Sequence, residues 1–148
     1  MTESSTIERR VDTLINYYGT SHTNPTNELI HFFAIPLITL SLSGLIYALS
    51  PIALYVFIAA SLIYYARLSI VFLIAMLVWS AAIIWLIESM GSQLFVTSLA
   101  IFVGAWILQF IGHKLEGKKP SFLEDLQYLW VGPLFVLSKL FIKLGIKW

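Results

Sequence analysis

Four long apolar segments limit the possible folds of this chain more than any other feature of its sequence. They run over Leu29–Leu49, Ile52–Tyr65, Leu68–Ile87 and Leu94–Ile111. A helix of about 20 apolar residues crosses the hydrocarbon core of a bilayer. In an open chain only a helix satisfies all backbone polar groups there. The sequence therefore predicts an all-α, polytopic membrane protein with four transmembrane helices, of which the second is short for a span.

The composition agrees with this class and excludes several others. Of 148 residues, 59% are hydrophobic and 11% are charged, which leaves too much apolar surface for a typical soluble domain. No basic stripe interleaved with aromatic residues lies outside the apolar segments, so we expect no nucleic-acid partner. The absence of cysteine excludes disulfides, thiolate metal sites and a cysteine nucleophile. The sequence has no glycine-rich phosphate fingerprint either.

The two ends of the chain are amphipathic rather than uniformly apolar. In residues 1–19, Ser5 to Glu8 have the form of a capping box, and apolar residues then recur at helical spacing. This pattern predicts an amphipathic helix on the membrane surface that ends near Gly19. Residues 122–148 are apolar but carry two acidic residues and three lysines, which favours interfacial helices over a fifth span. We expect one membrane domain over 1–148, in which these ends flank a four-span bundle over 29–111.

Basic residues in the connections indicate the orientation of the spans. Arg9 and Arg10 precede the first apolar segment, Arg67 separates the second from the third, and three lysines follow the fourth. The other two connections contain no Lys or Arg. Because cytoplasmic loops are enriched in these residues, both termini are predicted to be cytoplasmic.

The same topology brings the three histidines of the chain to one face of the membrane. His22 lies in the loop before the first span, His31 in its first turns, and His113 at the cytoplasmic end of the fourth span. Neutral imidazole is a common ligand for redox-active metals, and helical bundles build metal sites from separate helices. Three protein ligands would leave coordination positions open for substrate or dioxygen.

Other polar residues share these helix faces. Asn27 and Glu28 precede His31 by four and three residues, and Glu116 follows His113 by three. They are candidate metal ligands or partners that would fix the imidazole tautomers. Alternatively, His22 is a polar group at the membrane interface, and Glu116 is the partner of a surface ion pair.

Two blocks of sequence carry a family resemblance. The first runs from Tyr17 to His22, on through Asn27 to His31 and Ile35-Pro36-Leu37, and the second from Gln109 through Ile111-Gly112-His113 and Glu116 to Pro120. The pattern H-x4-N-x3-H, followed by I-G-H and a downstream E and P, resembles the 2-hydroxy fatty acid dioxygenase family of phytosphingosine breakdown. The segment Gly132 to Phe135 is similar to the closing segment of that family.

The resemblance implies iron(II)-dependent oxidation of a 2-hydroxy fatty acid by dioxygen to a fatty acid one carbon shorter and carbon dioxide. It implies that His22, His31 and His113 are the iron ligands, with Glu116 as a candidate fourth. Lys114 is a candidate partner for the substrate carboxylate. We expect membrane lipids as further partners, and the sequence is compatible with a homo-oligomer. The location would be the inner membrane in a bacterium or the endoplasmic reticulum in a eukaryote.

Two other classes of function remain open on the sequence alone. A small transporter is one, although charges within the apolar segments are sparse and no inverted repeat suggests a transport path. A non-catalytic membrane scaffold is the other, and it would not need the histidines. A di-iron hydroxylase with several histidine boxes is disfavoured because three histidines cannot fill them.

Overall fold

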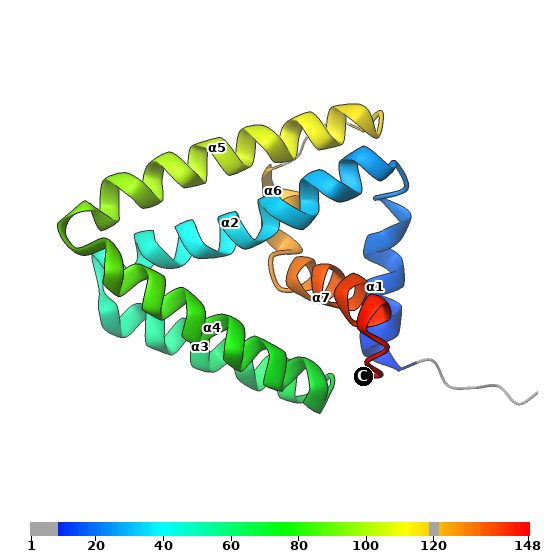
Figure 1. Cartoon of the computed structure of the whole chain (residues 1–148), viewed down its shortest axis with the longest axis horizontal. Coiled ribbons are helices and arrows are strands. Elements are labelled where there is room, and N and C mark those ends of the chain that lie inside the picture. The colour runs from blue at the N-terminus through cyan, green and yellow to red at the C-terminus, as the bar shows by residue number, and fades with distance from the viewer. Residues whose placement is uncertain (1–8, 119–121) are drawn as a thin grey trace, which may run out of the picture.

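The computed structural model describes residues 9–118 and 122–148, and every regular element in them is helical (Figure 1). This confirms the all-α prediction for the described residues, whereas the capping box of Ser5 to Glu8 lies outside them. The elements are α1 (Arg10–Thr20), α2 (Pro25–Leu49), α3 (Pro51–Ala66), α4 (Ile70–Met90), the short 3-10 turn η1 (Gly91–Gln93), α5 (Leu94–Leu115), α6 (Phe122–Gln127) and α7 (Val131–Leu144).

Local capping explains where the first two long helices begin. The side chain of Asn24 accepts hydrogen bonds from the backbone N–H groups of Thr26 and Asn27, at 2.9 and 3.3 Å. Pro25 then takes the first helical position, where the missing N–H has no cost. Ser50 and Pro51 repeat the arrangement at the start of α3. Helix α2 therefore begins four residues before the apolar segment that starts at Leu29.

The long helices form two antiparallel pairs. Helix α2 packs along α5, and α3 packs along α4 (Figure 1). The pairs meet at the end that holds Ser50 and η1 and spread apart toward the other end. Helices α2 and α5 approach closely at Gly44, where an added Cβ would lie 2.1 Å from the Ser98 hydroxyl oxygen. Both the start of α2 and the end of α5 consequently lie at the open end.

Helices α1 and α7 occupy this open end and form its core. Helix α7 is buried from Val131 to Ser138 and packs against the apolar face of α1 as well as against α2 and α4. In the structure the apolar faces of α1 and α7 cover each other, and the expectation that both ends of the chain lie at the membrane surface stays a prediction. An amphipathic pattern alone does not distinguish a lipid neighbour from a protein neighbour.

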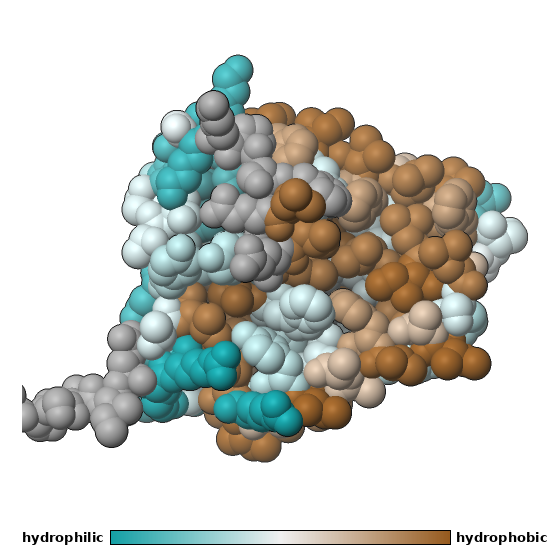
Figure 2. Space-filling view, turned by 180° about the vertical axis from the view of Figure 1, so that it is seen from behind, coloured by the Kyte–Doolittle hydropathy of each residue, from teal (hydrophilic) through white to brown (hydrophobic). Residues whose placement is uncertain are grey.

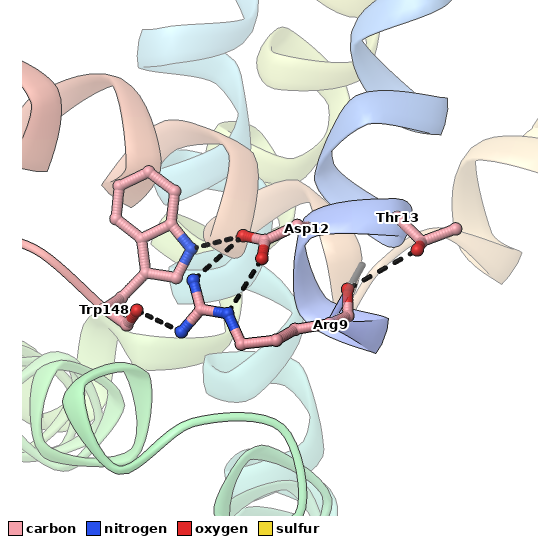
Figure 3. A network of polar contacts seen from close by, with 4 residues as sticks. All are labelled: Arg9, Asp12, Thr13 and Trp148. Atoms are coloured by element: carbon pink, nitrogen blue, oxygen red, sulfur yellow. Dashed lines mark hydrogen bonds and ion pairs between the residues drawn. The ribbon is translucent and has the colours of Figure 1, made fainter. Parts of the chain in front are cut away.

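A polar network joins the start of α1 to the end of the chain (Figure 3). The guanidinium of Arg9 donates to the Asp12 carboxylate at 2.9 Å and also to the backbone oxygen of Trp148. The Trp148 indole N–H donates to Asp12 at 2.8 Å, and its ring lies 5.6 Å from that of Phe72. The network fixes the last residue against α1 and α4.

Two helical stretches of the described residues are long and apolar enough to cross a membrane. One is α2, and the other is the run from Ile70 to Leu115, which includes α4, η1 and α5. Helix α3 is apolar but has only 16 residues. Figure 2 shows hydrophobic residues over much of the surface formed by the helix pairs, with hydrophilic residues gathered toward the end where α1 lies. The count of four spans remains a prediction.

Candidate metal centre

The three histidines meet at the open end of the helix pairs. His22 follows α1, His31 lies in the second turn of α2, and His113 lies in the last turn of α5. The ring centroids of His22 and His31 are 4.2 Å apart, those of His31 and His113 are 5.4 Å apart, and those of His22 and His113 are 6.2 Å apart. All three side chains are buried. The fold therefore brings the three histidines together at one site.

Backbone carbonyl groups fix the tautomers of two of these rings. Nδ1 of His22 lies 2.8 Å from the carbonyl oxygen of Tyr18, and Nδ1 of His31 lies 2.9 Å from that of Asn27. A carbonyl oxygen only accepts, so both Nδ1 atoms carry the hydrogen. Nε2 of a neutral ring is then an unprotonated acceptor, and both Nε2 atoms are buried without a hydrogen-bond partner. Burial lowers the pKa of His22, which favours this neutral form.

The third ring has a different partner. Nε2 of His113 lies 2.9 Å from each of the two carboxylate oxygens of Asp125, on α6. The side chains of His113 and Asp125 are only 10% and 11% exposed, so water screens this contact weakly. A largely buried carboxylate therefore faces the histidine cluster from a helix that lies outside the long apolar segments.

Glu116 joins the end of α5 to the loop before α2. Its carboxylate accepts hydrogen bonds from the Thr23 backbone and hydroxyl, the Asn24 backbone, and the Asn27 side chain. Burial acts to raise the pKa of Glu116, but these hydrogen bonds outweigh it and lower the pKa to about 2. Both carboxylate oxygens are thus engaged by the segment that carries His22, and the metal-ligand role of Glu116 stays an untested prediction.

The remaining residues singled out in the sequence have distinct places. Asn27 touches the site twice, through its carbonyl oxygen on His31 and its side chain on Glu116. Glu28 points elsewhere and pairs with Lys139 of α7 at 2.9 Å. Lys114 is exposed at the end of α5. The structure brings Asn27 to the histidine cluster, but it turns Glu28 toward α7.

Aromatic rings close one side of the cluster. The ring of Tyr18 stacks on His22 with centroids 4.2 Å apart and an interplanar angle of 13°, and Phe135 lies 5.7 Å from His22. Burial, reinforced by the charge of Asp125, raises the pKa of Tyr18, so its phenol stays neutral. A cavity of about 20 Å³ lies between Tyr18, Asp125 and Gln109. This volume suits a single molecule of the size of water.

A larger groove runs between α2 and α7, on the other side of Phe135. It has a volume of about 510 Å³ and is lined mainly by apolar side chains, among them Leu29, Phe32, Phe33, Phe135 and Leu140. The ion pair of Glu28 and Lys139, together with Lys143, supplies its charges. Phe135 lines this groove, and its ring also lies next to that of His22.

Sequence reasoning missed Asp125 and Tyr18 as members of this site. The contact of Asp125 with His113 joins two helices, so no local spacing reports it. Tyr18 lies four residues before His22, a helical spacing that could have indicated its contact with that ring. A second signal concerns Asp125. An aspartate within a largely apolar stretch is costly to bury without a partner, and such a residue is a candidate for a functional role.

The donor set fits a metal ion, although the described residues do not form a closed metal site. Within residues 9–118 and 122–148, no three histidine or acidic side chains already converge as ligands of one ion. Two unpartnered Nε2 atoms nevertheless meet a histidine–carboxylate pair in one buried cluster. Imidazole and carboxylate are the ligands of non-haem iron(II) oxygenases, which leave positions open for substrates.

Comparisons with known proteins identify the family of the chain. The family model described as 2-hydroxy-palmitic acid dioxygenase Mpo1-like matches residues 9–144. A protein of Saccharomyces cerevisiae named 2-hydroxy-palmitic acid dioxygenase is 28% identical over 141 residues, which cover 88% of this chain and 79% of the yeast protein. No solved structure matches the chain.

Proposed function

Because the chain belongs to the Mpo1-like family, described as 2-hydroxy-palmitic acid dioxygenases, we propose that it is an iron(II)-dependent dioxygenase of 2-hydroxy fatty acids. The substrate and one dioxygen would yield a fatty acid one carbon shorter, carbon dioxide and water. The four electrons that reduce dioxygen come from the substrate itself, so no reducing cosubstrate is needed. The observation that carries this proposal is the pair of unprotonated, unpartnered Nε2 atoms on His22 and His31 beside His113.

In this proposal, His22, His31 and His113 hold the iron. The bound iron would supply the redox chemistry that joins dioxygen to the 2-hydroxy acid. The protein contributes ligand orientation, because the carbonyl groups of Tyr18 and Asn27 hold two imidazoles with Nε2 free. Tyr18 and Phe135 shield the rings from water, which strengthens electrostatic interactions inside the site.

The groove between α2 and α7 supports an amphiphilic substrate. Its apolar lining would accept the acyl chain, and Lys139 or Lys143 would pair with the carboxylate. Lys139 lies over the Phe135 ring at 5.2 Å, which places a cation next to the wall of the histidine cluster. Lys114 is the alternative carboxylate partner, and its exposure makes it the weaker candidate because water competes for such a pair.

We further propose that α2, α3, α4 and α5 are four membrane spans with the site at the cytoplasmic face. Two apolar stretches support part of this topology. The arginines and lysines that flank the long helices agree with the orientation. The lipid-facing surfaces would give a hydrophobic substrate direct access to the groove from the bilayer.

The decisive experiment combines metal analysis with turnover of purified protein in detergent. Anaerobically reconstituted protein should bind one iron(II) and convert 2-hydroxypalmitate to a fatty acid one carbon shorter in an oxygen-dependent reaction, detected by mass spectrometry. His22→Ala, His31→Ala and His113→Ala should each lose both metal and activity while circular dichroism stays helical. Full activity in metal-free protein would refute the proposal.

Two further experiments test the other two classes of function. Metal-independent flux of a solute into liposomes would indicate a transporter. Unchanged function in cells that carry the three histidine variants would indicate a scaffold. Either result, without turnover of a 2-hydroxy acid, would overturn the enzymatic assignment.

A further inference from the structure

We propose that Asp125 is a ligand of the same metal ion and takes the fourth place that the sequence suggested for Glu116. The inference rests on the proposed metal-dependent function and adds a residue to its site. It concerns an aspartate on the short helix α6, whose carboxylate faces His113.

His113 and Asp125 are spaced like two ligands of one metal ion. Imidazole nitrogens and carboxylate oxygens lie about 2.1 Å from a divalent first-row metal ion, so two ligand atoms at about a right angle are about 3.0 Å apart. Nε2 of His113 lies 2.9 Å from both carboxylate oxygens of Asp125. The pair is therefore already spaced as neighbouring ligands, and an ion would replace the hydrogen that the pair now shares.

Competition for the carboxylates is the second argument. Both oxygens of the Glu116 carboxylate accept hydrogen bonds from Thr23, Asn24 and Asn27, and these hold the loop. The carboxylate of Asp125 instead faces the His113 ring, with both oxygens 2.9 Å from Nε2. Of these two carboxylates, that of Asp125 is the one already placed against a histidine nitrogen, so we expect it to bind the metal.

Burial is the third argument. A carboxylate with 11% side-chain exposure is costly unless a cation or several donors compensate it. Two neighbouring rings, His22 and His31, present unprotonated Nε2 atoms and so offer it no hydrogen. A divalent cation among them would balance the charge of Asp125 and would bind the Nε2 atoms of both His22 and His31.

The test measures metal binding rather than turnover. Cobalt(II) is titrated into the anaerobic apoprotein of wild type, Asp125→Asn and Asp125→Glu, and the visible ligand-field spectrum is recorded. Asp125→Asn should weaken cobalt affinity more than about 100-fold and should shift the absorption bands of the bound cobalt. Loss of a residue that only hydrogen-bonds to a metal ligand typically weakens metal affinity by roughly 10- to 100-fold. Asp125→Glu should restore part of the affinity.

Asp12→Asn is the matched control. Asp12 and Asp125 are the two aspartates of the chain, and Asp12 lies in the network with Arg9 and Trp148. Asp12→Asn should leave the spectrum and affinity unchanged. An unchanged spectrum in Asp125→Asn, whatever its affinity, would show that Asp125 only orients His113 and would overturn the proposal.

A second measurement needs no change at Asp125, so it stays informative if Asp125→Asn does not fold. Protein with heavy carbon in its aspartate carboxyl groups is prepared on the Asp12→Asn background, where Asp125 gives the only labelled signal. Infrared difference spectra before and after metal addition should show its carboxylate stretch shift on coordination. A stretch that does not move would overturn the proposal. Metal binding through Asp125 without turnover would instead refute only the proposed reaction.

Discussion

Gly112 of α5 lies so close to Asn27 of α2 that a Cβ added to the glycine would come within 2.3 Å of the Asn27 side-chain oxygen. The same Cβ would lie 3.3 Å from the His31 ring. The glycine before His113 therefore allows the two histidine-bearing helices to meet at the site.

Gly112→Ala is expected to disturb the metal centre directly. The added methyl group must displace Asn27, whose carbonyl oxygen fixes the His31 tautomer. Overpacking of this kind costs about 1–3 kcal/mol of stability. We expect a lower thermal midpoint and about 10-fold weaker cobalt affinity, measured by titration in detergent. Gly104→Ala, on the same helix with open space around it, should leave both unchanged.

Glu116→Gln tests whether the loop before α2 is held by charge. The pKa of Glu116 in the folded protein is about 2, below the ordinary pKa of 4.5. Its carboxylate therefore stabilises the fold above pH 4.5. That contribution is lost as the pH falls from 4.5 toward 2. Wild-type thermal stability should therefore decline over this range by more than that of Glu116→Gln, as followed by circular dichroism.

The control for this pH profile is Glu88→Gln, at the exposed end of α4 far from the loop. It should follow the wild-type profile. Parallel decline of wild type and Glu116→Gln would mean that the hydrogen bonds to Thr23, Asn24 and Asn27 do not depend on the charge.

Lys139→Gln tests the groove between α2 and α7 as the substrate site. Loss of the cation should raise KM for 2-hydroxypalmitate about 10-fold, equivalent to about 1.4 kcal/mol, with metal content unchanged. Glu28→Gln should lower KM, because it removes the carboxylate that competes for Lys139. If Lys114→Gln raises KM and Lys139→Gln does not, the carboxylate binds at the end of α5 instead.

Leu140→Trp tests whether the acyl chain lies in this groove. A larger side chain on the groove wall should shift the preferred substrate toward shorter 2-hydroxy acids, measured with a series of chain lengths. Leu144→Trp, on the same helix but outside the groove lining, is the control. An unchanged preference in Leu140→Trp would place the acyl chain elsewhere.

Trp148→Phe tests the network at the end of the chain. The variant keeps a ring against Phe72 but removes the indole N–H that donates a hydrogen bond to Asp12. It should therefore lower the free energy of unfolding by about 1 kcal/mol. Metal affinity should not change. Trp85→Phe, at an exposed position, should have no effect on the thermal midpoint.

Features set by short-range interactions were predictable from the sequence. The start of α2 at Asn24 and Pro25 is such a feature, because a cap and a proline act within one turn. The histidines share one end of the fold because helix length and connectivity dictate it. The position of Asp125 and the burial of α7 depend instead on packing between distant segments, which amphipathic spacing does not encode.

The way α7 fills the open end has a consequence for biosynthesis. Phe135 is made after its partner His22, and Asp125 is made after its partner His113. Contacts between distant segments form late, since the intervening chain must first be ordered. In the proposed topology, helices α2 to α5 could therefore be inserted while the ribosome is still translating, whereas the proposed iron loading would wait until α6 and α7 have docked.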